Sequence, residues 1–408
     1  MGGRASLPQL LSEAIRHADH GVVVSTSQAG LTHQKLDGLK NCPGFADTFL
    51  VNGKPPLPGH VLKQPALAKT FRHLADHGLD DFYRGTLARS MADDLTRVGS
   101  PVRLQDLQNY QASRVEPLHV RLTDSTVYNL PPPTQGLSAL MILGLFEQLR
   151  VKEGEGFAHV HGLVEATKRA FRVRDRVVTD PSRLPARPQD FLTGPALAQL
   201  AGEIDTEHAL PWPDPAQPGD TIWMGAVDAQ GRAVSFIQSV YWEFGSGTVL
   251  SNSGVCWQNR GTSFSLQPNA LNYLQPGLKP FHTLNPSLAV FDDGRVMPYG
   301  TMGGEGQPQT QAAVFTRYAR FGQTLQQAVS APRWLLGRTW GDVSTSLKLE
   351  NRFAPILLKA LIDAGHLVEV LPEAYSDTMG HAGALVRHAN GVIEAAVDPR
   401  SDGVVAAL

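Results

Sequence analysis

Residues 219–261 read GDTIWMGAVDAQGRAVSFIQSVYWEFGSGTVLSNSGVCWQNRG, and the first half of this stretch decides the fold. An apolar run begins at Asp220-Thr221 and reaches Asp228, and a second runs from Ala233 to Val240 after the turn Ala229-Gln230-Gly231. Two such runs around a short glycine-containing turn predict a β-hairpin.

The segment ahead of the hairpin has the opposite character. Residues 203–220, EIDTEHALPWPDPAQPGD, contain four prolines and several acids. They predict a flexible linker that ends where a buried strand begins. If the bond between Asp220 and Thr221 were cut, Thr221 would carry a hydroxyl nucleophile and its own α-amine as base, whose pKa is about 7.7 to 8.0 in reference peptides. The alternative is an ordinary β-branched residue at the start of a strand.

Further motifs follow Thr221 in a fixed order. They are Phe244-Gly245-Ser246-Gly247, Asn285-Pro286, Gly303-Gly304, Ala331-Pro332-Arg333 and Asp398-Pro399-Arg400-Ser401-Asp402-Gly403. With these motifs the chain resembles the γ-glutamyltransferase-like family of self-cleaving N-terminal-nucleophile hydrolases over residues 221–408, and more weakly over 130–136 and 161–174. The strings WQNRG, KPFHTLNPSL and YGTMGGEGQPQTQAAVFTRYARFG are similar to its oxamate amidohydrolase branch and to related acylases.

The resemblance implies an α+β fold, the four-layer αββα sandwich of N-terminal-nucleophile hydrolases. Strands paired as hairpins and helices grouped in blocks also favour stacked sheets covered by helices over an alternating βαβ fold. Cleavage of one precursor would give a large subunit, residues 1–220, and a small subunit, residues 221–408. Relatives carry a further segment ahead of LPQLLSEAIRHADHGVVVS. We therefore expect either a shortened reading frame or a large subunit shortened at its N-terminus, with a sheet edge left uncovered.

Periodicity outlines the elements. Helical spacing of apolar residues predicts helices over 9–19, 65–77, 87–98, 101–110, 134–149, 161–176, 308–320, 325–330 and 353–364. Alternation predicts strands over 117–127, around Lys348, and over 367–371, 382–387 and 393–397, with short strands throughout 221–302. In the helix over 161–176, Glu165, Lys168 and Arg172 follow one polar face, which we expect to be solvated.

Composition excludes several classes of function. The chain has 408 residues, 42% of them hydrophobic, and a net charge of -2, so no bulk attraction to nucleic acid or to an anionic membrane is expected. No apolar stretch approaches the roughly 20 residues that span a bilayer, and no signal peptide is found, so a cytoplasmic location is the default. Cys42 and Cys256 form no disulfide framework, and Cys256 is expected to be a buried thiol.

No metal and no cofactor are expected. His159 and His161 lie two residues apart, as metal-binding pairs sometimes do, but no third ligand pattern accompanies them.

The resemblance places the catalytic groups. Thr221 would be the nucleophile, and the backbone N–H groups of Gly303 and Gly304 would hold the oxyanion, for which glycine permits a close approach. The alternative for these glycines is a plain strand-to-helix turn. Ser239, on the return strand of the hairpin, lies where relatives place a hydroxyl that bonds the nucleophile; an ordinary strand serine is the alternative.

The expected pocket differs from that of glutamyl-accepting relatives. Those relatives have an asparagine in the pocket and an acidic residue that holds the α-ammonium group of the substrate. Aligned without gaps from Thr221, these two positions are Tyr241 and Ser263 in this chain. Arg260 lies where the relatives have a glutamine. The exchange favours a carboxylate over an ammonium group. Asn259, next to Arg260, is placed in the pocket with it. A structural ion pair is the alternative for Arg260.

His282 and Thr283 lie where relatives have paired hydroxyls at the start of a strand. His282 is expected to line the pocket as a hydrogen-bond donor and not to act as the base, because the Thr221 amine already has that role. A structural histidine is the alternative.

Three functions remain open. The first is hydrolysis of oxamate, or of a similar small carboxylated amide, to oxalate and ammonia. The second is a γ-glutamyl hydrolase or transferase, or a cephalosporin-type acylase, of the same family. The third is an uncleaved, inactive relative that acts as a binding protein. Whether the processed subunits form one heterodimer or two is left open.

Overall fold

The computed structural model describes residues 3–212, 220–337 and 344–407, and most of the expected linker before Asp220 lies outside them. Two compact units are present. Unit 1 comprises residues 1–114 and 243–259, and unit 2 comprises residues 115–242 and 260–408. This division crosses the expected subunit boundary after residue 220, so the subunit boundary stays a prediction.

Unit 1 is mainly helical, as expected for the first part of the chain. The helices predicted over 9–19, 65–77, 87–98 and 101–110 are α1 (Leu7–His20), α4 (Pro65–His77), α6 (Thr86–Arg97) and α7 (Leu104–Asn109). A capping box between Ser6 and Gln9 begins α1. The unit also contains α2 (Thr26–Leu39), α3 (Phe45–Phe49), α5 (Asp81–Arg84) and the strand pair β1 (Val22–Val23) and β2 (Val61–Leu62), which periodicity did not predict.

The loop over residues 243–259 packs within unit 1. The ring of Phe244 lies edge-on to those of Phe45 and Phe49, with centroids 5.3 and 5.1 Å away. Gly247 has a φ of 72°, and a Cβ there would lie 2.9 Å from the Cys42 sulfur. The Phe-Gly-Ser-Gly motif is therefore a tight turn that only glycine accommodates at this position.

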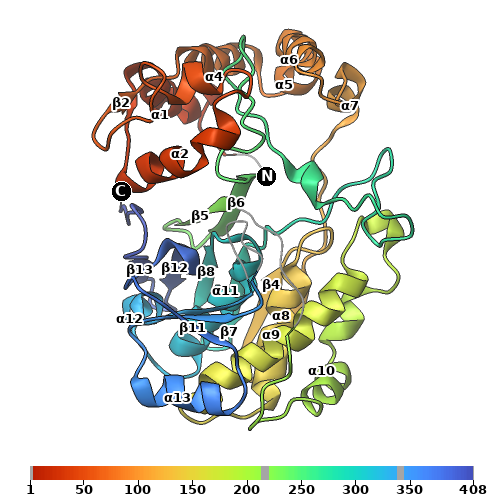
Figure 1. Cartoon of the computed structure of the whole chain (residues 1–408), viewed down its shortest axis with the longest axis vertical. Helices are drawn as coiled ribbons and strands as arrows, with labels where there is room; N and C mark the ends of the chain where they lie inside the picture. Colours follow the sequence, from red (N-terminus) through yellow and green to blue (C-terminus); the bar gives the residue numbers. More distant parts are fainter. Residues whose placement is uncertain (1–2, 213–219, 338–343, 408) are drawn as a thin grey trace. The chain divides into compact units, whose positions relative to one another are not determined.

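A six-stranded antiparallel sheet with the order β13-β12-β8-β7-β4-β3 forms the centre of unit 2 (Figure 1). Its strands are β3 (Leu118–Arg121), β4 (Ser125–Asn129), β7 (Ser287–Phe291), β8 (Val296–Thr301), β12 (Ala382–Arg387) and β13 (Ile393–Val397). The single strand predicted over 117–127 was wrong: the chain turns between Leu122 and Ser125, whose backbone groups bond at 2.9 Å, and returns as β4.

Helices pack on one face of this sheet. They are α8 (Gly136–Gln148), α11 (Gln307–Ala319) and α12 (Leu325–Ser330), with α9 (Phe157–Val177) packed on α8 and the short α10 (Gly194–Ala201) beside it. Phe315 of α11 stacks on Phe291 and Tyr299 of the sheet. This apolar layer is the main core of unit 2.

The expectation of a solvated polar face on α9 was wrong. Glu165 and Lys168 are 1% and 2% exposed and form an ion pair of 2.6 Å, and the Leu210 carbonyl accepts a second bond from the ammonium. Arg172 is half-buried. Spacing of charges along a helix does not distinguish a solvated face from a buried ion pair.

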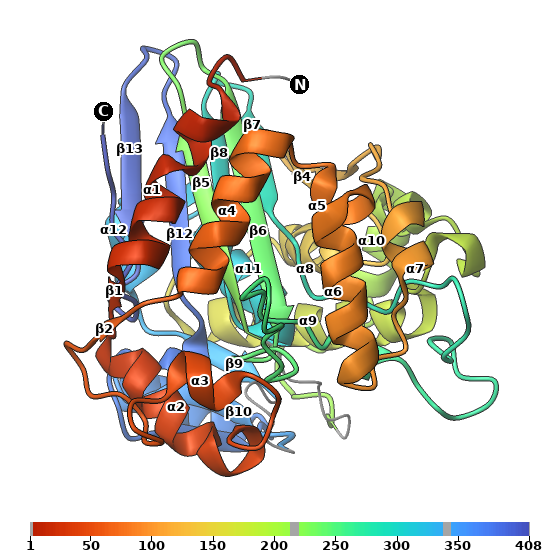
Figure 2. The ribbon, with the colours of Figure 1, turned by 90° about the horizontal axis from the view of Figure 1, so that it is seen from above.

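The predicted hairpin is confirmed as β5 (Asp220–Val227) and β6 (Ala233–Tyr241), which pair antiparallel and contact β8 and β12 (Figure 2). Trp223 joins the two sheets: a Cβ at Gly300 or at Gly383 would overlap its indole. The indole N–H donates to the Ser235 hydroxyl at 2.9 Å, and that hydroxyl donates to the Tyr299 carbonyl at 3.4 Å.

Two of the C-terminal motifs have a structural role. Arg333 pairs with Asp398, and Arg400 bonds both Asp398, at 3.0 Å, and Glu350, at 2.6 Å. All four side chains are 5% exposed or less. This charge cluster ties the C-terminal segment to the small sheet of β9 (Trp334–Leu336), β10 (Leu347–Glu350) and β11 (Val368–Leu371), which α13 (Pro355–Asp363) accompanies.

The expectation of short strands throughout 221–302 was only partly right. Between β6 and β7 the described chain contains isolated bridges and the 3-10 turn η3 (Arg260–Ser263) but no strand. Cys256 lies in this stretch, half-buried, and burial raises the pKa of its thiol to about 11. The thiol is therefore protonated at neutral pH.

Unit 2 thus contains a helical layer, a six-stranded sheet and a two-stranded sheet in succession, which are three layers of the expected sandwich. None of the described helices is both long and apolar enough to cross a membrane.

We expect Gly300→Ala to destabilise the protein by roughly 1 to 3 kcal/mol, because the added methyl group must displace the Trp223 indole. Gly194→Ala is the matched control, since a Cβ there meets no atom within 4 Å. Thermal unfolding of both variants checks this. Equal midpoints for Gly300→Ala and Gly194→Ala would contradict the role given to Trp223.

Candidate active site

The predicted nucleophile lies at an irregularity of the hairpin. Asp220 pairs with Tyr241 and Ile222 with Gln238, so Thr221 faces two residues of β6, Ser239 and Val240. A bulge of this kind re-aims a side chain and bends the strand. Thr221 is half-buried, and the Gln307 amide donates to its hydroxyl at 3.4 Å.

Ser239 and Tyr241 shape the other side of this bulge. The Ser239 hydroxyl accepts from the Tyr241 backbone N–H at 2.8 Å. Tyr241 is 1% exposed and has a φ of 85°, which is strained for a residue with a side chain. Such strain concentrates at functional sites. That Ser239 bonds the nucleophile stays a prediction.

Gly303 and Gly304 form the turn between β8 and the helix α11. Their φ angles are 114° and 52°, in the region that glycine favours. The Gly306 N–H donates to the Gly303 carbonyl at 2.8 Å, and the Gln307 N–H donates to the Gly304 carbonyl. Because a trans peptide points its C=O and N–H in opposite directions, the Gly304 N–H points away from the first turn of the helix. Gln307 also reaches Thr221, so this turn and the predicted nucleophile are close together.

Arg260 is 5% exposed and lies over the Tyr241 ring, 3.5 Å from its centroid. It also donates to the Thr283 hydroxyl at 3.0 Å. Burial lowers the pKa of Arg260 to about 10, so it keeps its charge at neutral pH. The structure thus brings together Arg260, Tyr241 and Thr283, three of the residues that the sequence placed in the pocket.

His282 is neutral in this site. Burial, with the nearby Arg260 charge, lowers the pKa of His282 to about 3. Its Nδ1 accepts from the Leu284 N–H at 3.4 Å, which places the proton on Nε2 and makes that atom a donor. This state fits a residue that lines a pocket and does not fit a base that is protonated near neutral pH.

The remaining predicted residues are less well placed. Ser263 ends η3, and its hydroxyl is buried without a hydrogen-bond partner among the described residues. Asn259 falls in unit 1, so its part in the pocket stays a prediction. Asp220 begins β5, and the cleavage after it also stays a prediction.

The sequence did not single out four buried polar residues beside these groups. They are Gln307 on the Thr221 hydroxyl, Gln135 and Glu305 at the glycine turn, and Arg174, which bonds both Gln135 and Glu305. All four lie inside stretches that carried the family resemblance, and that position was the only available signal.

One group of potential metal ligands exists among the described residues. Ligand atoms of His161, Glu165 and His366 lie within 4.8 Å of one another. The Asp205 carbonyl can only accept from His161 Nε2, at 2.9 Å, so His161 Nδ1 accepts from His366 Nε2 at 2.8 Å. Glu165 bonds the Lys168 ammonium. These ligand atoms already have partners in the protein, so we give the cluster a structural role.

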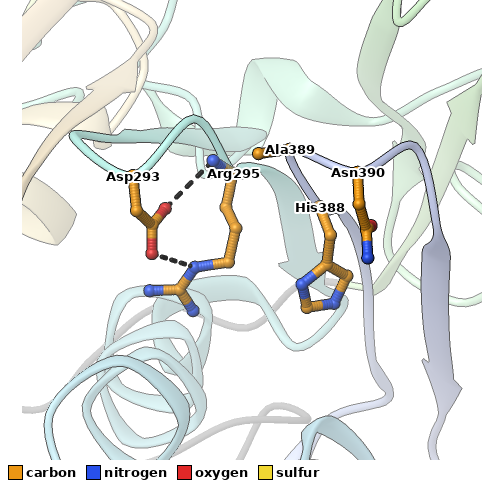
Figure 3. A pocket seen from close by; sticks show the side chains of 5 residues that line it. All are labelled: Asp293, Arg295, His388, Ala389 and Asn390. Atoms are coloured by element: carbon orange, nitrogen blue, oxygen red, sulfur yellow. Dashed lines mark hydrogen bonds and ion pairs between the residues drawn. The ribbon is translucent and has the colours of Figure 1, made fainter.

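A surface pocket of about 460 Å³ lies at the other end of the sheet. Asp293, Arg295, His388, Ala389 and Asn390 line it, from the β7–β8 and β12–β13 turns (Figure 3). The Arg295 guanidinium donates to Asp293 at 2.8 Å. Thr283 precedes β7 and Gly304 follows β8, so this pocket is separated from the candidate site by the length of these strands.

A threonine at the start of a strand, beside a glycine turn at the end of another, in stacked sheets, is the arrangement of an N-terminal-nucleophile hydrolase. Comparison with known proteins agrees. The model of the family Gamma-glutamyltranspeptidase matches residues 2–408. The chain belongs to this family of self-processing hydrolases.

Individual relatives narrow the comparison. The chain is 54% identical to the oxamate amidohydrolase proenzyme of Klebsiella pneumoniae over 99% of its length and 76% of the relative's. It is 38% identical to the glutathione hydrolase-like YwrD proenzyme of Bacillus subtilis, over 100% of this chain and 77% of the relative's length. The crystal structure of cephalosporin acylase from Bacillus halodurans matches with a TM-score of 0.91 and 32% identity, covering 100% of this chain and 75% of that one. These matches confirm the expected fold.

Buried histidines make stability depend on pH. His159 is 1% exposed; it accepts from the Glu155 N–H and bonds Thr316, and burial, with the Arg317 charge, lowers the pKa of His159 to about 3. The unfolded chain, in which this histidine has a pKa of about 6.5, therefore binds the proton first as pH falls. Stability is expected to fall from about pH 6.5 downward.

We expect His159→Gln to flatten this dependence. Between about pH 7.5 and pH 5 the parent should lose about 2 kcal/mol through His159 alone, and the variant should not. Urea unfolding at the two pH values measures the difference. If parent and variant lose equal stability on acidification, His159 is not the group responsible.

Proposed function

We propose that this chain is a self-cleaving amidohydrolase that converts oxamate, or a similar small carboxylated amide, to the carboxylic acid and ammonia. The position of Arg260 carries the proposal: a buried guanidinium stacked on Tyr241 and bonded to Thr283 favours a substrate carboxylate. The 54% identity to a relative named oxamate amidohydrolase proenzyme supports the same substrate.

Maturation would divide the chain after Asp220. The Thr221 hydroxyl attacks the preceding carbonyl, the acyl group moves from nitrogen to oxygen, and water releases the ester, leaving Thr221 with a free α-amine. The products are pieces of 220 and 188 residues (408 minus 220). How many such heterodimers assemble, and the cytoplasmic location, stay predictions.

In turnover the Thr221 amine takes the hydroxyl proton as Thr221 Oγ1 attacks the amide carbonyl of the substrate. The Gly303 and Gly304 N–H groups stabilise the oxyanion, as preorganised donors do in acyl transfer. The amine returns its proton to the leaving ammonia. Water then hydrolyses the oxalyl ester and restores Thr221. Arg260 holds the carboxylate, and His282 donates a hydrogen bond from the pocket wall.

A larger acyl group is the second candidate. The glutathione hydrolase-like relative and the cephalosporin acylase structure favour it, since each is similar over the whole of this chain. Ammonia release from oxamate, measured beside chromophore release from a γ-glutamyl anilide, separates the two. A chain that stays in one piece on denaturing electrophoresis would favour the inactive binding protein.

We expect Thr221→Ala to abolish both self-cleavage and turnover, because one hydroxyl serves both reactions. Thr221→Ser should retain both at lower rates. Denaturing electrophoresis and an ammonia assay measure the two steps separately. Two bands from the alanine variant would refute the cleavage site.

We expect Arg260→Leu to raise the Michaelis constant for oxamate by roughly 30- to 1000-fold, because a charge-assisted contact worth about 2 to 4 kcal/mol is lost. Self-cleavage involves no external carboxylate and should persist. Arg260→Lys should recover part of the loss, since it keeps the charge without the fork geometry.

Arg295→Leu is the matched control, because Arg295 also lies over an aromatic ring, that of Phe291 at 4.3 Å, but at the other end of the sheet. Its oxamate kinetics should equal those of the parent. Unchanged kinetics in Arg260→Leu would show that the carboxylate is held elsewhere and would favour the larger acyl group.

A further inference from the structure

Gln135 lies at the junction of three elements of the candidate site. It precedes the helix α8 and is 0% exposed. Its backbone N–H donates to the His282 carbonyl at 2.9 Å, and its backbone carbonyl accepts from the Ser138 hydroxyl at 2.7 Å. The main chain at this residue is therefore fixed from both sides, and the side chain extends from a rigid base.

The side-chain amide of Gln135 uses both of its donors on the site. One N–H bonds the Gly304 carbonyl at 2.8 Å and the other bonds the Thr283 carbonyl at 2.9 Å. The first bond holds the glycine turn. The second bond holds Thr283, whose hydroxyl accepts a hydrogen bond from Arg260. A single side chain thus sets the separation between the expected oxyanion donors and the expected carboxylate pocket.

Arg174 fixes the orientation of this amide. It donates to Gln135 Oε1 at 3.3 Å and pairs with Glu305 at 2.7 Å. Burial disfavours its charge, but Asp175 and Glu305 outweigh burial, so the pKa of Arg174 lies above its ordinary value. Because the Arg174 guanidinium is always charged and binds Gln135 Oε1, the Gln135 amide nitrogen faces the Thr283 and Gly304 carbonyls. Two donors and one acceptor in this arrangement match glutamine and no other side chain of that length.

These contacts connect the two expected subunits. Gln135 and Arg174 precede the expected cleavage bond after residue 220, whereas Thr283, Gly304 and Glu305 follow it. After cleavage these residues would belong to two separate chains, and the hydrogen bonds between them would remain within the buried core.

We propose that Gln135 is a positioning residue for hydrolysis, through which the large subunit holds the oxyanion turn and the carboxylate pocket of the small subunit in register. This inference rests on the proposed function. Gln135 touches no substrate in this scheme and acts through Gly304 and Thr283. Arg174 in turn fixes the Gln135 amide.

Two substitutions test the role. Gln135→Met removes all three side-chain bonds at nearly constant length, and Gln135→Glu keeps an acceptor for Arg174 while removing both donors. We expect both variants to fold and self-cleave. Their kcat for oxamate per processed molecule should fall roughly 10- to 100-fold, as small displacements of catalytic groups cause, and their KM should rise several-fold.

Gln323→Met is the control, since the Gln323 amide bonds Glu155 at 3.0 Å, away from these elements, and its kcat and KM should equal those of the parent. Active-site titration and thermal unfolding accompany the kinetics. A merely structural residue would lower the yield or the melting temperature and leave kcat and KM per active site unchanged.

Each outcome decides the proposal. Unchanged kcat and KM per processed molecule in both Gln135 variants would overturn the positioning role, and so would failure of both to accumulate as folded, processed protein. The parent tests the proposed function separately. If it hydrolyses another amide and not oxamate, the same comparison is made with that amide. A parent that hydrolyses no amide would refute the proposed function and the positioning role with it.

Discussion

Contact between the β5–β6 sheet and the six-stranded sheet depends on one aromatic side chain, that of Trp223, and on two glycines that leave room for it. The Trp223 indole occupies the space that side chains at Gly300 and Gly383 would fill. Close contact between sheets is stabilised by the area removed from water and by dispersion, both of which fall steeply with separation. Because Trp223 is two residues beyond Thr221 on β5, the same contact holds the start of that strand against the end of β8, where Gly303 and Gly304 lie.

The site follows from this arrangement by successive local constraints. A bulge opposite Ser239 and Val240 turns Thr221 out of the regular ladder. Helix α11 begins directly after the glycine turn, so Gln307 bonds the turn with its backbone and Thr221 with its side chain. Polar groups are costly in such a core unless bonded. The Gln135 side chain donates to the Gly304 and Thr283 carbonyls, and the Gln307 side chain donates to the Thr221 hydroxyl.

Much of the fold could be predicted from the sequence. Periodicity located the hairpin and placed α12, β12 and β13 at their observed bounds, because each has strong local patterning. It failed where the deciding contact is distant in the chain. Beyond the break in the strand predicted over 117–127, β4 pairs with the distant β7, and the buried Lys168 bonds the distant Leu210 carbonyl. In the site, motif order led to Thr221 and Gly304, and gapless alignment with relatives from Thr221 led to Arg260. The role proposed for Gln135 depends on bonds across 148 and 169 residues, which no local pattern contains.

The two buried arginines beside the site, Arg174 and Arg260, have different surroundings, and this difference favours a structural role for one and a binding role for the other. Arg174 lies between the carboxylates of Asp175 and Glu305, which compensate its charge, and its pKa is raised. Arg260 lies over the Tyr241 ring and donates to the Thr283 hydroxyl; burial outweighs the favourable charge of Glu305 and lowers the pKa of Arg260 to about 10. A cation in surroundings that disfavour its charge gains most from an arriving anion, because the anion offsets a desolvation cost already incurred in folding. Of the two, Arg260 is therefore the one that we propose for a substrate carboxylate, and Arg174 the one that we propose holds the groups around it.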